Sequence, residues 1–111
     1  MTIFQVTSWH TSPSRLLFLS HHVRELRARR SANVDLGSLR YVKSLGAVLG
    51  AASQRVIEAV LGVPVIQLYG CTELFTMASY PVTAVASGTL DATPGATGRI
   101  CAGVRLRVKH C

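Results

Sequence analysis

Residues 65–73 read VIQLYGCTE, an apolar run that ends in a glycine, a hydroxyl and a carboxylate. The apolar residues from Val63 to Leu68 predict a buried strand, and Pro64 stands near its start, where a missing backbone donor is tolerated. The residues that follow, Tyr69 to Glu73, predict a loop. This stretch therefore predicts a core strand that delivers polar side chains to the loop at its carboxyl end.

The residues before this strand predict a helix and an earlier strand. The helix is expected to begin at Gly50 and to end at Gly62, which stands where a glycine C-cap belongs. Its predicted apolar stripe is Ala52, Val56 and Val60. The earlier strand is expected from Leu39 to Lys43, where apolar and basic residues alternate.

A strand, a helix and a second strand in this order form a βαβ unit, and its right-handed crossover makes the two strands parallel. The predicted fold class is therefore α/β, a βαβ unit with further strands. The loops at 44–47 and 69–73 both leave the carboxyl ends of parallel strands. Because open α/β sheets hold ligands at that edge, we expect the two loops to share a site.

The two ends of the chain predict a helix and a strand. Ser12 followed by Pro13 predicts a helix start, and apolar residues recur after it at helical spacing, namely Leu16, Leu19, Val23 and Leu26. Residues 74–82 predict a strand or an irregular segment, and residues 86–98 a loop. Near the end, Val104, Leu106 and Val108 alternate with basic residues, which predicts a half-exposed strand.

Composition bounds the size and the partners of this protein. The 111 residues, 49% of them hydrophobic, are enough for at most one domain. The net charge of +7 suggests nucleic acid, but six of the 12 basic residues lie in 1–40 and four in 99–111, with few aromatic residues among them. We expect no nucleic-acid partner. A small basic protein that binds nucleic acid or acidic surfaces remains the alternative.

Several other signatures are missing from the sequence. Three scattered cysteines form neither a disulfide framework nor a zinc motif, and we expect an intracellular, reducing location, cytoplasmic or peroxisomal. No apolar run approaches the length of a membrane span, so none is expected. The glycines match neither a Walker loop nor a dinucleotide fingerprint, and there is no G-x-S-x-G elbow.

The residue types in the 69–73 loop leave two interpretations open. In the first, Gly70 lets the backbone approach a ligand, Thr72 donates to a phosphate oxygen, and Glu73 shares Mg²⁺ with substrate phosphates. Tyr69 then offers a flat face to a nucleobase. In the second interpretation the segment is an ordinary turn with an exposed glutamate.

Five segments in order resemble the AMP-forming acyl-CoA synthetases, the adenylate-forming superfamily that includes 4-coumarate:CoA ligases and beetle luciferases. Residues 35–40, DLGSLR, are similar to the family's lead-in, and residues 42–50, VKSLGAVLG, to its S-G-G/A-A-P-L loop. Residues 65–73 resemble its Q-G-Y-G-x-T-E motif. The segments PGATGR at 94–99 and GVRLRV at 103–108 match its downstream part. The chain as a whole, 1–111, thus resembles part of an AMP-binding (adenylation) domain, with 1–34 the least distinctive.

The resemblance implies a function and a set of site residues. It implies an acid–thiol ligase that uses ATP, Mg²⁺ and, as co-substrate, CoA to activate a small carboxylic acid as an acyl-adenylate. Its nucleotide-binding residues would be Gly46, Ala47, Gln67, Leu68, Tyr69, Gly70 and Thr72. Ser44 and Gly46 would border the acyl substrate. Thr72 and Glu73 would be catalytic, and Glu73 would bind the metal.

The chain also departs from the family pattern. Leu45 replaces the first loop glycine and Val48 replaces the proline. The family's phosphate loop, ribose-binding aspartate, hinge and catalytic lysine have no counterpart in these 111 residues. We therefore expect a fragment of the large domain that does not catalyse acyl-CoA formation alone. A degenerate relative that only associates with a partner is a third possibility.

Overall fold

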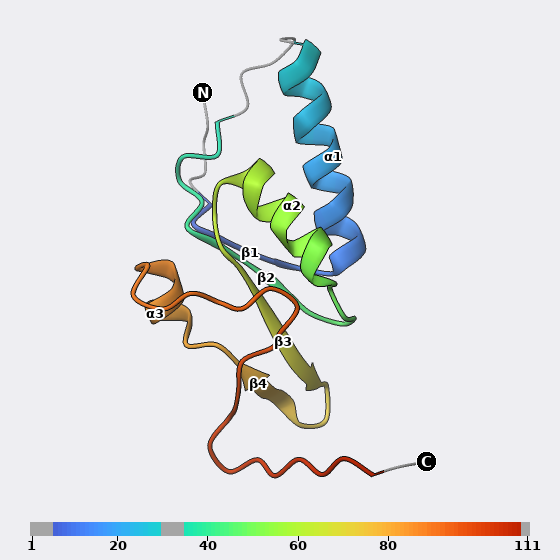
Figure 1. Cartoon of the computed structure of the whole chain (residues 1–111), viewed down its shortest axis with the longest axis vertical. Helices are drawn as coiled ribbons and strands as arrows, with labels where there is room; N and C mark the ends of the chain where they lie inside the picture. Colours follow the sequence, from blue (N-terminus) through green and yellow to red (C-terminus); the bar gives the residue numbers. More distant parts are fainter. Residues whose placement is uncertain (1–5, 30–34, 110–111) are drawn as a thin grey trace.

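The computed structural model describes residues 6–29 and 35–109 as a mixed α/β unit (Figure 1). In chain order its elements are β1 (Ser8–Thr11), α1 (Pro13–Arg29), β2 (Tyr41–Ser44), α2 (Ala51–Leu61), β3 (Val65–Cys71), β4 (Phe75–Ser79), α3 (Val82–Ala86) and β5 (Arg99–Ile100). The strands form one sheet in the order β1-β2-β3-β4-β5. The first three strands are parallel, and the β3–β4 and β4–β5 pairs are antiparallel.

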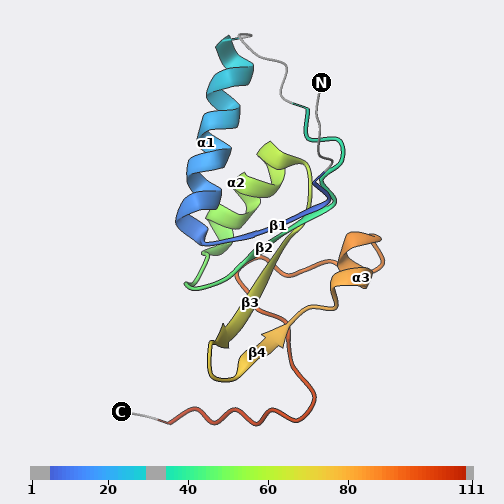
Figure 2. The same ribbon diagram turned by 180° about the vertical axis from the view of Figure 1, so that it is seen from behind.

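Two successive βαβ units build the parallel half of the sheet. The predicted unit, β2-α2-β3, is confirmed, because Val42 pairs in parallel register with Val65 and Ser44 with Gln67. A second unit, β1-α1-β2, precedes it. Since β1, β2 and β3 are neighbours in order, two right-handed crossovers place both helices on one face. Figures 1 and 2 show α1 and α2 packed against each other on that face.

Local signals in the sequence set the ends of the two long helices. Helix α1 begins at Pro13, as predicted, and the Leu16 N–H donates to the Ser12 carbonyl at 3.1 Å. Helix α2 ends at Leu61, and its C-cap Gly62 has a φ of 72° and donates its N–H to the Glu58 carbonyl at 2.8 Å. This left-handed conformation carries little cost only for glycine, which explains the C-cap.

The predicted stripe of α2 is confirmed only at Val60, which packs against the core, whereas Ala52 and Val56 are exposed. The buried residues of this helix are Gln54, Ile57 and Leu61. Because Gln54 is polar, hydrophobic periodicity did not identify the buried face correctly. The amide of Gln54 is fully hydrogen-bonded, and this lets it occupy a core position.

Strand β3 changes partner halfway along its length. Its first residues pair with β2, and from Leu68 onward it pairs with β4, with an irregularity between Tyr69 and Gly70. The predicted loop at 69–73 is therefore shorter than expected, because Tyr69 to Cys71 continue the strand. The strand carries the turn that follows it well beyond the parallel part of the sheet (Figure 1).

Three elements differ from the sequence predictions. Strand β1 and the short helix α3 were not anticipated. The expected strand through Val104, Leu106 and Val108 was wrong, since residues 104–109 adopt no regular structure. Figure 2 shows this segment running away from the body of the molecule, and it pairs with none of the strands in the described ranges. Strand β5 forms instead at Arg99–Ile100, beside β4.

The core lies between the parallel strands and the two helices. It is formed by Leu16, Val23, Val42, Leu49, Ile57, Leu61 and Val65, with Trp9 among the partly buried residues packed against it. Within the described ranges, no helix combines the length and the apolar character that crossing a membrane requires.

Candidate functional site

Two hollows meet at the carboxyl edge of β2 and β3. The larger, which we call the groove, has a volume of about 480 Å³, and the smaller, which we call the side pocket, has about 350 Å³. The groove is lined by Gly46, Ala47, Val48, Gln67, Leu68, Tyr69, Gly70, Gly95, Ala96, Thr97 and Gly98. The side pocket is lined by Leu45, Gly46, Leu68, Gly70, Cys71, Thr72, Phe75 and Thr76. Gly46, Leu68 and Gly70 line both, so the two hollows adjoin.

The loop between β2 and α2 forms the first wall of the groove. Its start is held by the Leu45 N–H, which donates to the Thr11 carbonyl at 3.1 Å. Its end is held by the amide of Gln67, which accepts from the Leu49 N–H at 3.1 Å and donates to the Leu49 carbonyl at 2.9 Å. The segment between these anchors, with Gly46 and Ala47, is exposed along the groove.

A tight hairpin turn between β3 and β4 closes the side pocket. Residues 72–74 form the turn, and Cys71 pairs with Phe75 across it. The carbonyl of Phe75 lies so close to Gly70 that a Cβ at residue 70 would collide with it. Glycine at this position therefore allows the two strands to meet where Thr72 enters the pocket.

The loop before β5 forms the second wall, which the sequence analysis missed. Gly95 to Gly98 line the groove together with Gly46 and Ala47. A Cβ on Gly98 would lie 2.6 Å from the carbonyl carbon of Ser79, so only glycine fits there. The Gly95 N–H donates to Gln54 Oε1 at 3.0 Å. The two glycines were the available signal, but residues 86–98 were expected only to be a loop.

Most predicted site residues line the two hollows, as the shared sheet edge requires. Gly46, Leu68 and Gly70 stand at their junction, and Tyr69, which is 50% exposed, borders the groove with Ala47. Thr72 lines the side pocket together with Gly46. The two predicted loops therefore do open onto a common space.

Two other predicted residues lie beneath this surface. Ser44 is 1% exposed and lines neither hollow, and its hydroxyl has no partner within the described part of the chain. Gln67 borders the groove but is only 3% exposed, and its side-chain amide is bonded to Leu49 and Gln54. Because those bonds use both N–H donors of its amide, the side chain of Gln67 has no donor left for a ligand, and it acts on the groove through the backbone of Leu49 that it holds.

Glu73 stands on the hairpin turn, exposed and outside the lining of both hollows. The pKa of Glu73 lies below its ordinary value, because its own backbone N–H and then the Cys71 thiol donate hydrogen bonds to the carboxylate. It is therefore ionised at neutral pH. Among the residues that the structure describes, no three histidine, cysteine or acidic side chains form a group that could hold a metal.

The hydrogen bond from Cys71 to Glu73 predicts a pH effect. In Cys71→Ala, the titration midpoint of Glu73 is expected to move up towards its ordinary value, as measured by the NMR shift of its carboxyl carbon. Because the pKa of Glu73 is lower in the folded chain than in the unfolded chain, its ionised carboxylate stabilises the folded state at any pH above the ordinary pKa. This stabilisation is lost as the pH falls through the pKa of the folded state. Cys71→Ser, which keeps a donor, is the control. An unchanged midpoint in Cys71→Ala would contradict the assignment.

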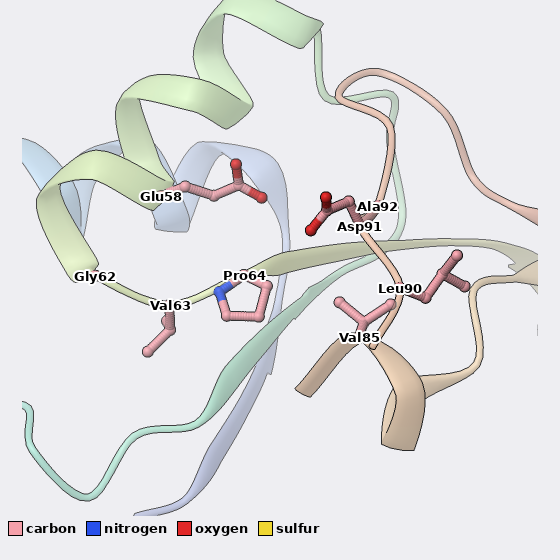
Figure 3. Close-up of a pocket in the computed structure, with 8 residues that line it drawn as sticks. All are labelled: Glu58, Gly62, Val63, Pro64, Val85, Leu90, Asp91 and Ala92. Atoms are coloured by element: carbon pink, nitrogen blue, oxygen red, sulfur yellow. The ribbon is translucent and has the colours of Figure 1, made fainter. Parts of the chain in front are cut away.

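A further hollow of about 460 Å³ lies at the opposite end of β3, between α2 and α3 (Figure 3). Glu58 and Asp91 line it, and in Figure 3 their carboxylates point towards the space between α2 and the 90–92 segment. The Glu58 carboxylate already accepts hydrogen bonds from Gln54 and from the Val65 N–H. This hollow contains none of the predicted site residues.

The fold and the position of the groove together define an α/β domain that presents its ligand edge at the ends of parallel strands. Its structure is similar to that of the anthranilate CoA ligase AuaEII in complex with anthranoyl-AMP, with a TM-score of 0.70 and 24% identity over 91% of this chain and 17% of that one. It is also similar to the AMPPNP-bound nonribosomal peptide synthetase FmoA3, with a TM-score of 0.58 and 22% identity over 88% of this chain and 10% of that one.

The family model for AMP-binding enzymes matches residues 1–111, and the chain belongs to that family. Its structural neighbours are adenylate-forming ligases, which confirms the resemblance drawn from the five sequence segments. The chain spans less than a fifth of the length of either of these two structures. No curated protein matches it.

Proposed function

We propose that this chain is the part of an ATP-dependent acyl- or aryl-CoA ligase that holds the acyl-adenylate. The observation that carries the proposal is the junction of the groove with the side pocket at Gly46, Leu68 and Gly70. An acyl-adenylate has a polar nucleotide half and an organic acid half joined by one mixed anhydride. Two adjoining hollows can take the two halves of such a ligand.

The chemistry of the linings assigns one half to each hollow. No charged side chain lines either hollow, but the groove is lined by glycine-rich backbone from two loops, and Tyr69 offers an aromatic face to a base. The side pocket carries the apolar side chains Leu45, Leu68 and Phe75. We therefore assign the nucleotide to the groove and an apolar aliphatic or aromatic acid to the side pocket, with the phosphate near Thr72.

In the proposed reaction a substrate carboxylate oxygen attacks the α-phosphorus of ATP. The bond from that phosphorus to the pyrophosphate oxygen breaks, and acyl-AMP forms. The CoA thiol then attacks the acyl carbonyl, loses its proton, and displaces AMP to leave a thioester. Stabilisation of charge on the transferring phosphoryl group is the largest contribution to such catalysis, and a hydroxyl donor such as Thr72 supplies part of it.

One residue near the proposed nucleotide site, Glu73, is suited to bind Mg²⁺. Sites for Mg²⁺ commonly use only one or two protein carboxylates, with substrate phosphates and water as the other ligands. Glu73 offers one exposed, ionised carboxylate next to Thr72. When bound there, the ion would neutralise phosphate charge, while Glu73 would hold it beside the nucleotide.

Nucleotide binding by the 111-residue chain tests the proposal. In a backbone NMR titration with AMP, we expect the largest shifts at Gly46, Tyr69, Gly70 and Gly98, and none at Val85 in the distant hollow. A chain that binds DNA in a salt-dependent way and leaves these four amides unmoved with AMP would contradict the proposal and favour the basic binding protein.

Glu73→Gln is expected to weaken the affinity for Mg²⁺–ATP by about tenfold, because a charge-assisted contact is lost. The affinity for AMP without metal is expected to stay within about twofold, since Glu73 lines neither hollow. Isothermal titration of both ligands measures the two effects, and Glu25→Gln on the exposed face of α1 is the matched control. If Glu73→Gln weakened the affinities for AMP and for Mg²⁺–ATP equally, Glu73 would not be a metal ligand.

A further inference from the structure

A chain of buried hydrogen bonds runs beneath the groove from one wall to the other. On one side the Gly95 N–H donates to Gln54 Oε1 at 3.0 Å. The same oxygen accepts from Gln67 Nε2, also at 3.0 Å. Gln67 in turn holds the N–H and the carbonyl of Leu49. Two glutamine amides therefore connect the 94–98 loop with the 45–50 loop.

All four N–H donors of the two amides are engaged. The two hydrogens of Gln54 Nε2 go to Glu58 Oε1 at 3.2 Å and to the Val65 carbonyl at 3.1 Å. The two hydrogens of Gln67 Nε2 go to the Leu49 carbonyl and to Gln54 Oε1. Gln54 is 1% exposed and Gln67 is 3% exposed. Such a network is rigid because any displacement leaves a buried polar group without a partner.

The network joins α2 and β3 to two loops of the groove. Gln54 lies on α2, Gln67 lies on β3, and the backbone groups of Leu49 and Gly95 that they bind belong to the two loops that line the groove. No hydrogen bond of the described residues joins the two loops directly. Gly95 lies directly beside Ala51 at the start of α2, and the two glutamines supply the hydrogen bonds that hold the two walls in this arrangement.

We propose that Gln54 and Gln67 are positioning residues that hold the two walls at the separation a nucleotide requires. This inference rests on the proposed function, since the nucleotide is the ligand assigned to the groove. Neither side chain needs to touch the ligand: Gln67 acts through Leu49 and the residues before it, and Gln54 acts through Gly95. Loss of either amide would free the wall that it holds and would also remove one hydrogen bond of the other amide.

Amide hydrogen exchange of the ligand-free chain separates the two roles. Gln67→Met keeps the length of the side chain and is expected to raise the exchange rate at Leu49 by about tenfold or more. Gln54→Met is expected to do the same at Gly95. The Gly62 amide, bonded to Glu58 at the far end of α2, is the internal reference, and Arg55→Met on the exposed face of the same helix is the matched control.

Affinity for AMP then tests positioning. Both glutamine variants are expected to bind AMP about tenfold more weakly than the wild type, with no such loss in Arg55→Met. Faster exchange at Leu49 or Gly95 with unchanged AMP affinity would overturn the inference, as would unchanged exchange at both amides. A wild type that shows the expected exchange pattern in its variants but binds no AMP would instead overturn the proposed function.

Gln67→Glu provides a pH-dependent readout of the same network, measured over the pH range in which circular dichroism shows the variant to be folded. The introduced carboxyl would face the Leu49 carbonyl and Gln54 Oε1, so it repels them when ionised and donates one hydrogen bond when protonated. Its AMP affinity relative to the wild type is expected to recover from about pH 8 to about pH 5. Glu58, the titratable group bonded to Gln54, is present in both proteins, and the ratio removes its contribution. A ratio independent of pH would count against the inference.

Discussion

Gly70→Ala is expected to lower the free energy of unfolding by about 3 kcal/mol and to weaken AMP binding by about tenfold or more. The added Cβ would collide with the carbonyl of Phe75 and lie 3.1 Å from the Cα of Thr76. Both contacts are backbone atoms of the neighbouring strand, so no side-chain rotation relieves them. The strands must separate at the point where the groove and the side pocket join.

Gly50→Ala is the matched control for this change. Gly50 has a φ of −64°, which alanine adopts freely, and a Cβ there meets no atom within 4 Å. It should cost less than about 1 kcal/mol, which arises only from its place at the N-cap of α2. Chemical denaturation and an AMP titration measure both variants. Equal stability losses for the two variants would show that strand contact at Gly70 is not the constraint.

The parallel part of the fold could be predicted because its signals are local. The apolar residues of β3, the Ser12-Pro13 start of α1 and the glycine that ends α2 each act within a few residues of themselves. Since right-handed crossover fixes the rest, the shared edge of the two loops followed from the order of elements alone. Gly46 and Thr72 line the same pocket for this reason.

The remaining features depend on contacts between distant segments. The alternating residues 104–108 carry the pattern of a strand, but a strand also needs a neighbour, and Val108 is 97% exposed. Gln54 has the sequence character of a surface residue and is buried because Gln67, Val65 and Gly95 supply its partners. The second wall of the groove was missed for the same reason, since its anchor lies on α2, about forty residues earlier.

The two glutamines predict non-additive stability changes. Gln54→Met and Gln67→Met are each expected to lower the free energy of unfolding by about 2 kcal/mol, because each leaves buried groups without a partner. Gln67→Met removes the hydrogen-bond partner of the Leu49 N–H. Gln54→Met removes the partners of the Gly95 N–H and of the Val65 carbonyl. Urea denaturation followed by circular dichroism measures both values.

The double variant should cost less than the sum of the two single variants, by about 1 kcal/mol. Each single change leaves one amide facing an apolar side chain, whereas the double change removes both partners of the bond between Gln67 Nε2 and Gln54 Oε1. The free-energy cost of breaking this bond is therefore included in both single variants but only once in the double variant. Additive losses would mean that the two amides act independently, each on its own loop. If Gln54 and Gln67 acted independently, a displacement of one loop would not affect the other. The hydrogen bond between the two amides would then not couple the two walls of the groove.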